Sequence, residues 1–147
     1  MHWHFAKFDD LGPRDIHDLY QARVAVFVLE QKCPFQDVDG ADPQCWHLIG
    51  RDAPGGDVLA YSRIVPPGLK YAEPSIGRVL TTEKGRGSGA GRELMGESIA
   101  RLEKLWPGRP IRIGAQQYLE KFYGSFGFRR TSEPYDEDGI MHIEMVR

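Results

Sequence analysis

The sequence has few of the features that mark secreted, membrane or disulfide-stabilised proteins. Only two of its 147 residues are cysteines, which is too few for a disulfide framework and favours a reducing compartment. No apolar run approaches the roughly 18 residues of a membrane span, and Asp9 and Asp10 close to the N-terminus argue against a signal peptide. We therefore expect a cytoplasmic protein with no membrane partner.

The sequence also lacks an excess of charge of one sign. Its 19 lysines and arginines face 21 aspartates and glutamates, giving a formal net charge of −2, and the signs are mixed along the chain. A nucleic-acid partner is not expected, because such proteins carry a basic patch. Residues 1–147, of which 41% are hydrophobic, are predicted to form one domain with its own core. Small-molecule or peptide partners are expected.

Known metal-binding and hydrolase patterns are missing or incomplete. The acidic stretch 37–42 has the aspartate spacing of a calcium loop, but its glycine is at the wrong offset and Leu48 stands where a bidentate glutamate is needed. Cys33, Cys45 and His47 would require a fourth zinc ligand that the pattern does not supply. No Gly-x-Ser-x-Gly elbow is present. We expect no metal and no serine hydrolase.

Hydrophobic periodicity predicts strands alternating with helices along the chain. Strands are expected at 3–8, 47–49, 58–65, 75–81, 111–115, 128–131 and 140–146, and helices at 15–28, 92–105 and 118–126. Asp15 is expected at the N-cap or in the first turn of the first helix. The buried face of that helix is predicted to consist of Ile16, Leu19, Tyr20, Val24, Phe27 and Val28.

A glycine-rich turn precedes the second helix. Gly85, Gly87, Gly89 and Gly91 alternate with other residues, and no acidic side chain interrupts them. Glycines permit positive φ and let a ligand approach main-chain N–H groups, and a helix N-terminus adds unpaired donors and a partial positive charge. Arg86 and Arg92 flank the turn. This combination predicts a site for a phosphate or pyrophosphate.

The motif narrows the choice of phosphate ligand. The Gly-Lys-Ser/Thr ending of a nucleoside triphosphate loop is absent, and the turn lies too late in the chain for a dinucleotide fingerprint. The spacing Arg86-x-x-Gly89-x-Gly91 resembles the coenzyme A loop of the GNAT acyltransferases.

A second motif lies at the separation that this family shows, namely Phe122-Tyr123-x-x-x-Gly127-Phe128. The segments 27–40, 61–64, 77–79, 114–116 and 137–143 resemble the ElaA-like branch of the same family. The resemblance covers nearly the whole chain. It implies an α/β (α+β) GNAT fold, with a mixed central sheet of about six to seven strands, about four flanking helices and splayed central strands.

The activity implied by the resemblance is transfer of an acetyl group from acetyl-CoA to a primary amine, by direct attack in a ternary complex. The alternative is a non-catalytic module that binds or senses acyl-CoA. The residues expected at the coenzyme are Val79, Leu80, Thr81, Arg86, Gly87, Ser88, Gly89, Ala90, Gly91, Arg92, Gln116 and Tyr123.

Tyr123 matches the family's general acid, which protonates the departing thiolate. An unperturbed tyrosine is a weaker acid than a thiol, so this role requires help, which placement near the end of a buried helix or immediate trapping of the thiol could supply. The alternative is a core aromatic on a helical stripe. The candidates for the base are Glu30 and His142, with His47 less favoured.

The acceptor amine is expected to contact Gln31, Asp37, Asp39, Arg63 and Arg78. Carboxylates in this loop would attract a cationic amine, although an acidic run is also typical of a solvated face. Each arginine, being on a strand, needs an anionic partner and could take an aspartate of the loop. The identity of the acceptor stays open. A homodimer is compatible with the apolar strand faces of this fold.

Overall fold

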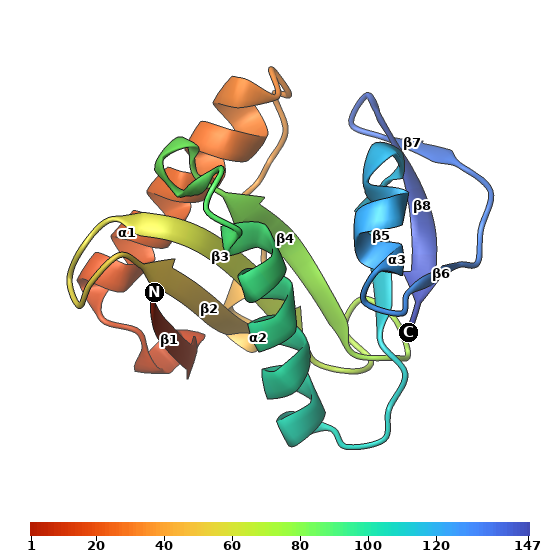
Figure 1. The fold of residues 1–147 in the computed structure, drawn as a ribbon, viewed down its shortest axis with the longest axis horizontal. Coiled ribbons are helices and arrows are strands. Elements are labelled where there is room, and N and C mark those ends of the chain that lie inside the picture. Colours follow the sequence, from red (N-terminus) through yellow and green to blue (C-terminus); the bar gives the residue numbers. More distant parts are fainter.

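Two antiparallel sheets diverge from a shared base in the computed structural model, which describes all 147 residues (Figure 1). The first sheet has the order β1-β2-β3-β4, with strands His2–Lys7, Trp46–Arg51, Val58–Val65 and Ser75–Thr81. The second has the order β5-β8-β6, with β7 also pairing with β8. Its strands are β5 Arg112–Gln116, β6 Arg129–Arg130, β7 Tyr135–Glu137 and β8 Ile140–Val146.

The strands β4 and β5 are neighbours that separate. At their base, the Arg112 N–H donates to the Pro74 carbonyl oxygen over 3.1 Å. Beyond that bond the two strands belong to different sheets and run the same way while moving apart (Figure 1). The edge of β4 that faces β5 therefore has no strand partner, which leaves main-chain donors and acceptors free. The predicted splayed strands are present.

The first helix changes its winding part-way along. α1, Pro13–Arg23, begins with Pro13 in its first turn, and Asp15 is the predicted first-turn acid. It continues as a π-helical segment, Val24–Glu30. The predicted buried stripe is wrong at Val24, which is 39% exposed, whereas Val26 is buried. The buried residues Leu19, Ala22, Arg23 and Val26 keep the i, i+3, i+4, i+7 spacing of a helix face, so the stripe passes through Arg23 and leaves Val24 outside it.

The second helix follows its sequence pattern. α2, Ala90–Leu105, buries the predicted stripe Leu94, Met95, Ser98, Ile99 and Leu102, while Leu105 is only half-buried. The one polar member, Ser98, bonds to the Ser62 hydroxyl of β3 and to the Leu94 carbonyl oxygen, each over 2.7 Å. α3, Glu120–Gly124, is shorter than predicted because its first turn is a 3-10 turn.

One hydrophobic cluster joins the two sheets at their base. It contains Ile64 and Ile76 of the first sheet, Ile113 and Ile143 of the second, and Met95 of α2. Burying a side chain of this size contributes about 1.5–3 kcal/mol, so the vertex of the two sheets is well held. No helix in the structure has the length and apolar run that a membrane span needs.

The C-terminal part contains a strand that the sequence pattern did not indicate. The predicted strand at 128–131 is reduced to β6, two residues long, which pairs with β8 as expected. The additional strand is β7, whose Tyr-Asp-Glu sequence has no apolar alternation. It forms because Tyr135 lies opposite His142 in a hairpin with β8. The sheets therefore contain eight strands in total.

Candidate functional site

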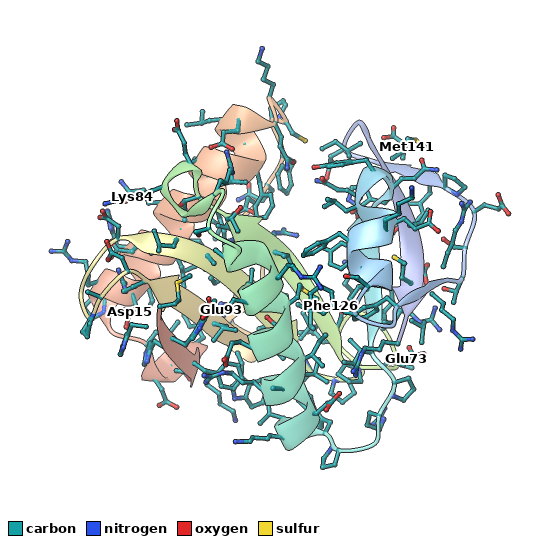
Figure 2. All side chains as sticks on the ribbon, in the orientation of Figure 1. Asp15, Glu73, Lys84, Glu93, Phe126 and Met141 are labelled. Carbon is teal, nitrogen blue, oxygen red and sulfur yellow. The ribbon has the colours of Figure 1, made fainter.

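A cleft of about 1120 Å³ lies between β4 and β5. Side chains from both sheets enter the space between the two arms of the fold (Figure 2). The predicted site residues that line it are Glu30, Gln31, Asp39, Arg63, Arg78, Val79, Leu80, Thr81, Arg86, Gly91, Gln116, Tyr123 and His142. Those that do not are Asp37, Gly87, Ser88, Gly89, Ala90 and Arg92.

The glycine turn has the free donors that an anion needs. Gly87 and Gly89 have φ values of +80° and +79°, and a Cβ at either position would meet nothing within 4 Å. Gly89 is the N-cap of α2, with no side-chain cap. None of the six backbone N–H groups from Gly87 to Arg92 donates a hydrogen bond within the protein. This loop therefore fits the diphosphate of a coenzyme A molecule.

The other two glycines serve different purposes, which corrects the expectation of positive φ at all four. A Cβ on Gly85 would overlap the backbone oxygen of Leu59, so that position requires close backbone contact. Gly91 lies in the first turn of α2, and its Cβ would make only ordinary contacts, 3.8 Å from Thr81 and 3.9 Å from Phe122.

The two flanking arginines differ in their contacts. Arg86 donates from Nη2 to Glu30 Oε1 over 2.6 Å and to the Thr81 carbonyl oxygen over 2.9 Å. Arg92 donates to the Ser125 hydroxyl over 3.2 Å and lies over the ring of Phe126. The carboxylate of Glu30, a candidate base, is therefore paired with the arginine expected at the phosphates.

A bulge re-aims the middle of β4. Tyr61 pairs with Leu80 and Arg63 with Gly77, so β4 has one residue more than β3 over this stretch. Arg78 lies in the bulge with a φ of +49°, a left-handed conformation that costs a non-glycine residue free energy. Its Nε donates to Asp37 Oδ1 over 2.9 Å. The bulge places the main chain of Val79 to Thr81 beside the cleft.

Tyr123 is 7% exposed and lines the cleft. Burial, with a smaller effect from Tyr118, raises the pKa of Tyr123 to about 12. Placement near the end of a buried helix was expected to help the phenol release its proton, but burial does the reverse. The phenol is therefore a hydrogen-bond donor that stays protonated at neutral pH.

Two hydrogen bonds cross the cleft from the second sheet to the segment that follows the first helix. Gln116 of β5 donates from Nε2 to Gln31 Oε1 over 3.4 Å. The Cys33 thiol donates to the Asp138 carbonyl oxygen over 3.1 Å. Gln116, which was expected at the coenzyme, and Gln31, which was expected at the acceptor, are therefore in contact across the gap.

The two histidines differ in environment. His47 is fully buried, with Nε2–H donating to the Asp42 carbonyl oxygen over 3.0 Å and Nδ1 accepting from the Tyr61 hydroxyl over 2.7 Å. Burial lowers the pKa of His47, which makes it a neutral core histidine outside the cleft.

His142 lines the cleft and stacks on Tyr135. Its Nδ1 lies 2.8 Å from the Ile140 carbonyl oxygen and its Nε2 lies 3.3 Å from Glu137 Oε2. Both oxygens are acceptors, so a ring nitrogen donates a hydrogen bond to either of them only when it carries a proton. To accept a proton from a substrate, Nε2 would have to turn away from Glu137.

The acidic loop forms a buried ionic network. Arg23 donates to Asp37 over 2.9 Å and to Asp42 over 2.7 Å, and Arg63 donates to Asp39 over 2.7 Å and to Asp42 over 3.0 Å. The expectation that each strand arginine pairs with an aspartate is confirmed. Arg23 was missed, although an arginine four residues after Leu19 on the apolar face of the helix was a signal.

The network sets the ionisation of its acids. Burial alone would raise the pKa of Asp42, but the hydrogen bonds and charges of Arg23 and Arg63 outweigh burial and lower it. The pKa of Asp39 is likewise lowered, with Arg63 outweighing desolvation. Arg23 and Arg63 therefore favour the ionised forms of Asp39 and Asp42.

Comparison with known proteins assigns the family. The sequence profile described as acetyltransferase (GNAT) domain matches residues 64–147. The chain is 38% identical over 149 aligned residues to Protein ElaA of Escherichia coli, covering 100% of this chain and 96% of the relative. The chain belongs to the GNAT family, in its ElaA-like branch. It is also 40% identical to the UPF0039 protein sll0451 of Synechocystis, covering 99% of this chain and 94% of that protein.

Solved GNAT structures agree with the fold. An acyl-CoA N-acyltransferase from Pseudomonas aeruginosa superposes with a TM-score of 0.92 at 40% identity, covering 99% of this chain and 98% of that chain. Escherichia coli ElaA superposes with a TM-score of 0.91 at 38% identity and the same coverage. The predicted α+β GNAT fold is confirmed.

Proposed function

We propose that the chain is an N-acyltransferase that moves an acetyl group from acetyl-CoA to a primary amine, by direct attack within a ternary complex. The observation that carries this proposal is the row of six undonated N–H groups from Gly87 to Arg92 at the entrance of α2. The Pseudomonas protein described as an acyl-CoA N-acyltransferase supports extending an acyl-CoA reaction to this chain.

The cleft has the elements that such a reaction needs. Amides 87–92, with the side chain of Arg86, would hold the diphosphate. The unpaired edge of β4 at Val79 to Thr81 would accept and donate hydrogen bonds along the pantetheine arm, and Gln116 faces this arm from β5. A backbone N–H of the same edge would stabilise the oxyanion that forms when the amine nitrogen attacks the thioester carbon.

The protons that move in the reaction make Tyr123 a hydrogen-bond donor rather than the source of the transferred proton. The amine loses one proton and the leaving sulfur gains one. Proton transfer from a phenol at pKa about 12 to an ordinary thiolate at ~8.5 is uphill by roughly 5 kcal/mol. We therefore assign Tyr123 a hydrogen bond to the departing sulfur, which lowers the barrier while the amine proton supplies the final protonation.

We propose that the base, which accepts the proton of the attacking amine, is either Glu30 or His142. Glu30 must leave Arg86 to accept a proton, and His142 must leave Glu137. Binding of a diphosphate to Arg86 would release the Glu30 carboxylate, which favours Glu30. The second candidate function, a non-catalytic acyl-CoA-binding module, would require no base.

The experiment is release of free thiol from acetyl-CoA with a panel of primary amines, alongside thermal stabilisation by coenzyme A. Amine-dependent thiol release that gives an N-acetylated product is the expected result. Stabilisation by coenzyme A without turnover on any amine would favour the binding module. Absence of both would contradict the use of coenzyme A altogether.

A further inference from the structure

The walls of the cleft carry charged groups at two levels. β4 leaves the vertex at Pro74, so at ~3.3 Å per residue Gly77 lies roughly 10 Å from the vertex and Thr81 roughly 23 Å from it. Arg86 contacts Thr81 at the outer level. The inner level is the one that coenzyme loop residues do not reach, and it therefore belongs to the acceptor side.

Arg63 occupies the inner level and has an unused edge. It pairs with Gly77 across β3 and β4 and is 4% exposed. All of its hydrogen bonds run through Nη1, to Asp39 and Asp42. Its Nε is buried without a partner. A buried donor without an acceptor is costly and rare, and the Nε–Nη2 edge of a guanidinium is suited to the two oxygens of a carboxylate.

Lys70 lies at the same level on the opposite wall. Its Nζ is 3.8 Å from the position that a Cβ on Gly114 would take, and Gly114 is two residues beyond the vertex residue Arg112 on β5. It also lies 5.3 Å from the centre of the Tyr71 ring. No carboxylate lies within ion-pair distance of Lys70, and desolvation lowers its pKa.

The aspartates near this level are already neutralised. Arg23, Arg63 and Arg78 match Asp37, Asp39 and Asp42 in charge, and every one of these six groups takes part in the network. Lys70 adds one positive charge to this neutral set; it forms no ion pair, and Glu137 is the carboxylate that attracts it most strongly. On the wall formed by the second sheet, Glu137 of β7 lies beside His142 of β8. The inner level therefore offers a localised cationic site among groups of both signs.

We propose that the acceptor amine also carries a carboxylate, which binds the Nε–Nη2 edge of Arg63 and the ammonium of Lys70. This substrate class, an amino acid or a short peptide, rests on the proposed transferase function. The carboxylate at the inner level leaves the amine directed along β4 toward Tyr123. A phosphate dianion fits less well, because Asp39 and Glu137 line the same cleft.

The test compares amines that differ only in the carboxylate. Suitable pairs are glycine and glycinamide, β-alanine and its amide, 4-aminobutyrate and its amide, and lysine and cadaverine. For at least one spacing we expect kcat/KM to favour the acid by roughly tenfold to a hundredfold, as for a charged hydrogen bond. No preference at any spacing, or a stronger preference for phosphoethanolamine than for every acid, would overturn the proposal.

Variants locate the preference. Lys70→Met removes an ammonium that takes part in no ion pair, and Arg63→Lys keeps the charge but loses the two-donor edge. Each should reduce the acid-to-amide ratio toward one. Lys104→Met, on an exposed position of α2, is the matched control and should retain the wild-type ratio. A wild-type ratio in Lys70→Met would contradict the assignment.

A binding measurement separates this proposal from the transferase function. Calorimetry with coenzyme A present compares N-acetyl-β-alanine with N-acetyl-β-alaninamide, which need no turnover. Carboxylate-dependent binding without acetyl transfer to any amine would support the subsite and count against the transferase. Acetyl transfer without any carboxylate dependence in rate or binding would do the opposite.

Discussion

Replacing Gly89 by asparagine or aspartate isolates the electrostatics of the coenzyme loop. The residue has a φ of +79°, and a Cβ there would meet nothing within 4 Å. Asparagine and aspartate both tolerate the left-handed conformation better than other residues. The two side chains have nearly the same shape, so the pair differs mainly by one negative charge at the N-terminus of α2.

The magnitude follows from Coulomb's law. Two unit charges about 4 Å apart interact by about 1 kcal/mol in bulk water and about 4 kcal/mol at an effective dielectric constant of 20. Gly89 is exposed, which places the interaction toward the lower figure. We expect the aspartate variant to bind coenzyme A roughly fivefold to thirtyfold more weakly than the asparagine variant.

The assay is calorimetric titration with coenzyme A, repeated at high salt, where the difference should shrink because exposed charges are screened. Thermal melting provides the control, since both variants should unfold at similar temperatures. Equal affinities for the two folded variants, at low salt, would refute an anion site at this turn.

Four further predictions test other parts of the account. Tyr123→Phe should lower kcat by roughly 10²-fold or more without changing coenzyme A affinity. The shape of the pH–rate profile below pH ~10 should stay the same, because the pKa of Tyr123 is raised to about 12. A rising or falling limb of the wild-type profile that disappears in the phenylalanine variant would contradict this. The lowered pKa of Asp42 means that the unfolded state takes up a proton on this group first as pH falls. The contribution of Asp42 to the free energy of unfolding, taken as wild type minus Asp42→Asn, should therefore be constant above pH ~5 and drop below pH ~4. A difference that does not change with pH in denaturant titrations would exclude the network as a source of stability. Asp42→Asn should cost about 3–5 kcal/mol, because Arg23 then lacks half of its counter-charge, and a loss below 1 kcal/mol would be inconsistent with a buried network. Gly85→Ala should destabilise the fold through backbone overlap, whereas Gly96→Ala, with open space around its Cβ inside α2, should stabilise it by up to about 1 kcal/mol; melting temperatures that shift the same way would contradict this.

Local patterns predicted the parts of the fold that depend on local forces. The stripe of α2 was predictable because its buried residues, Leu94, Met95, Ser98, Ile99 and Leu102, recur with the regular period of a helix. The glycine turn was predictable because Gly87 and Gly89 combine positive φ with an adjacent helix start. The splayed strands came from the family resemblance, since no residue of β4 or β5 signals their separation.

Features that depend on distant contacts were not predictable. Arg23 is buried and Val24 is exposed, a shift of one position that an apolar pattern cannot show because Arg23 is charged. β7 forms through pairing with β8 alone. The buried position of Arg23 depends on Asp37 and Asp42, which lie 14 and 19 residues away, and the unpaired Nε of Arg63 is visible only once that network is in place.

The most direct test of the central claim is amide NMR of the labelled protein during titration with coenzyme A and, separately, with pantetheine. We expect the backbone N–H signals of residues 87–92 to shift with coenzyme A and to stay in place with pantetheine, which lacks the diphosphate. Signals of these six amides that do not move while coenzyme A binds elsewhere on the protein would contradict the claim that they hold it.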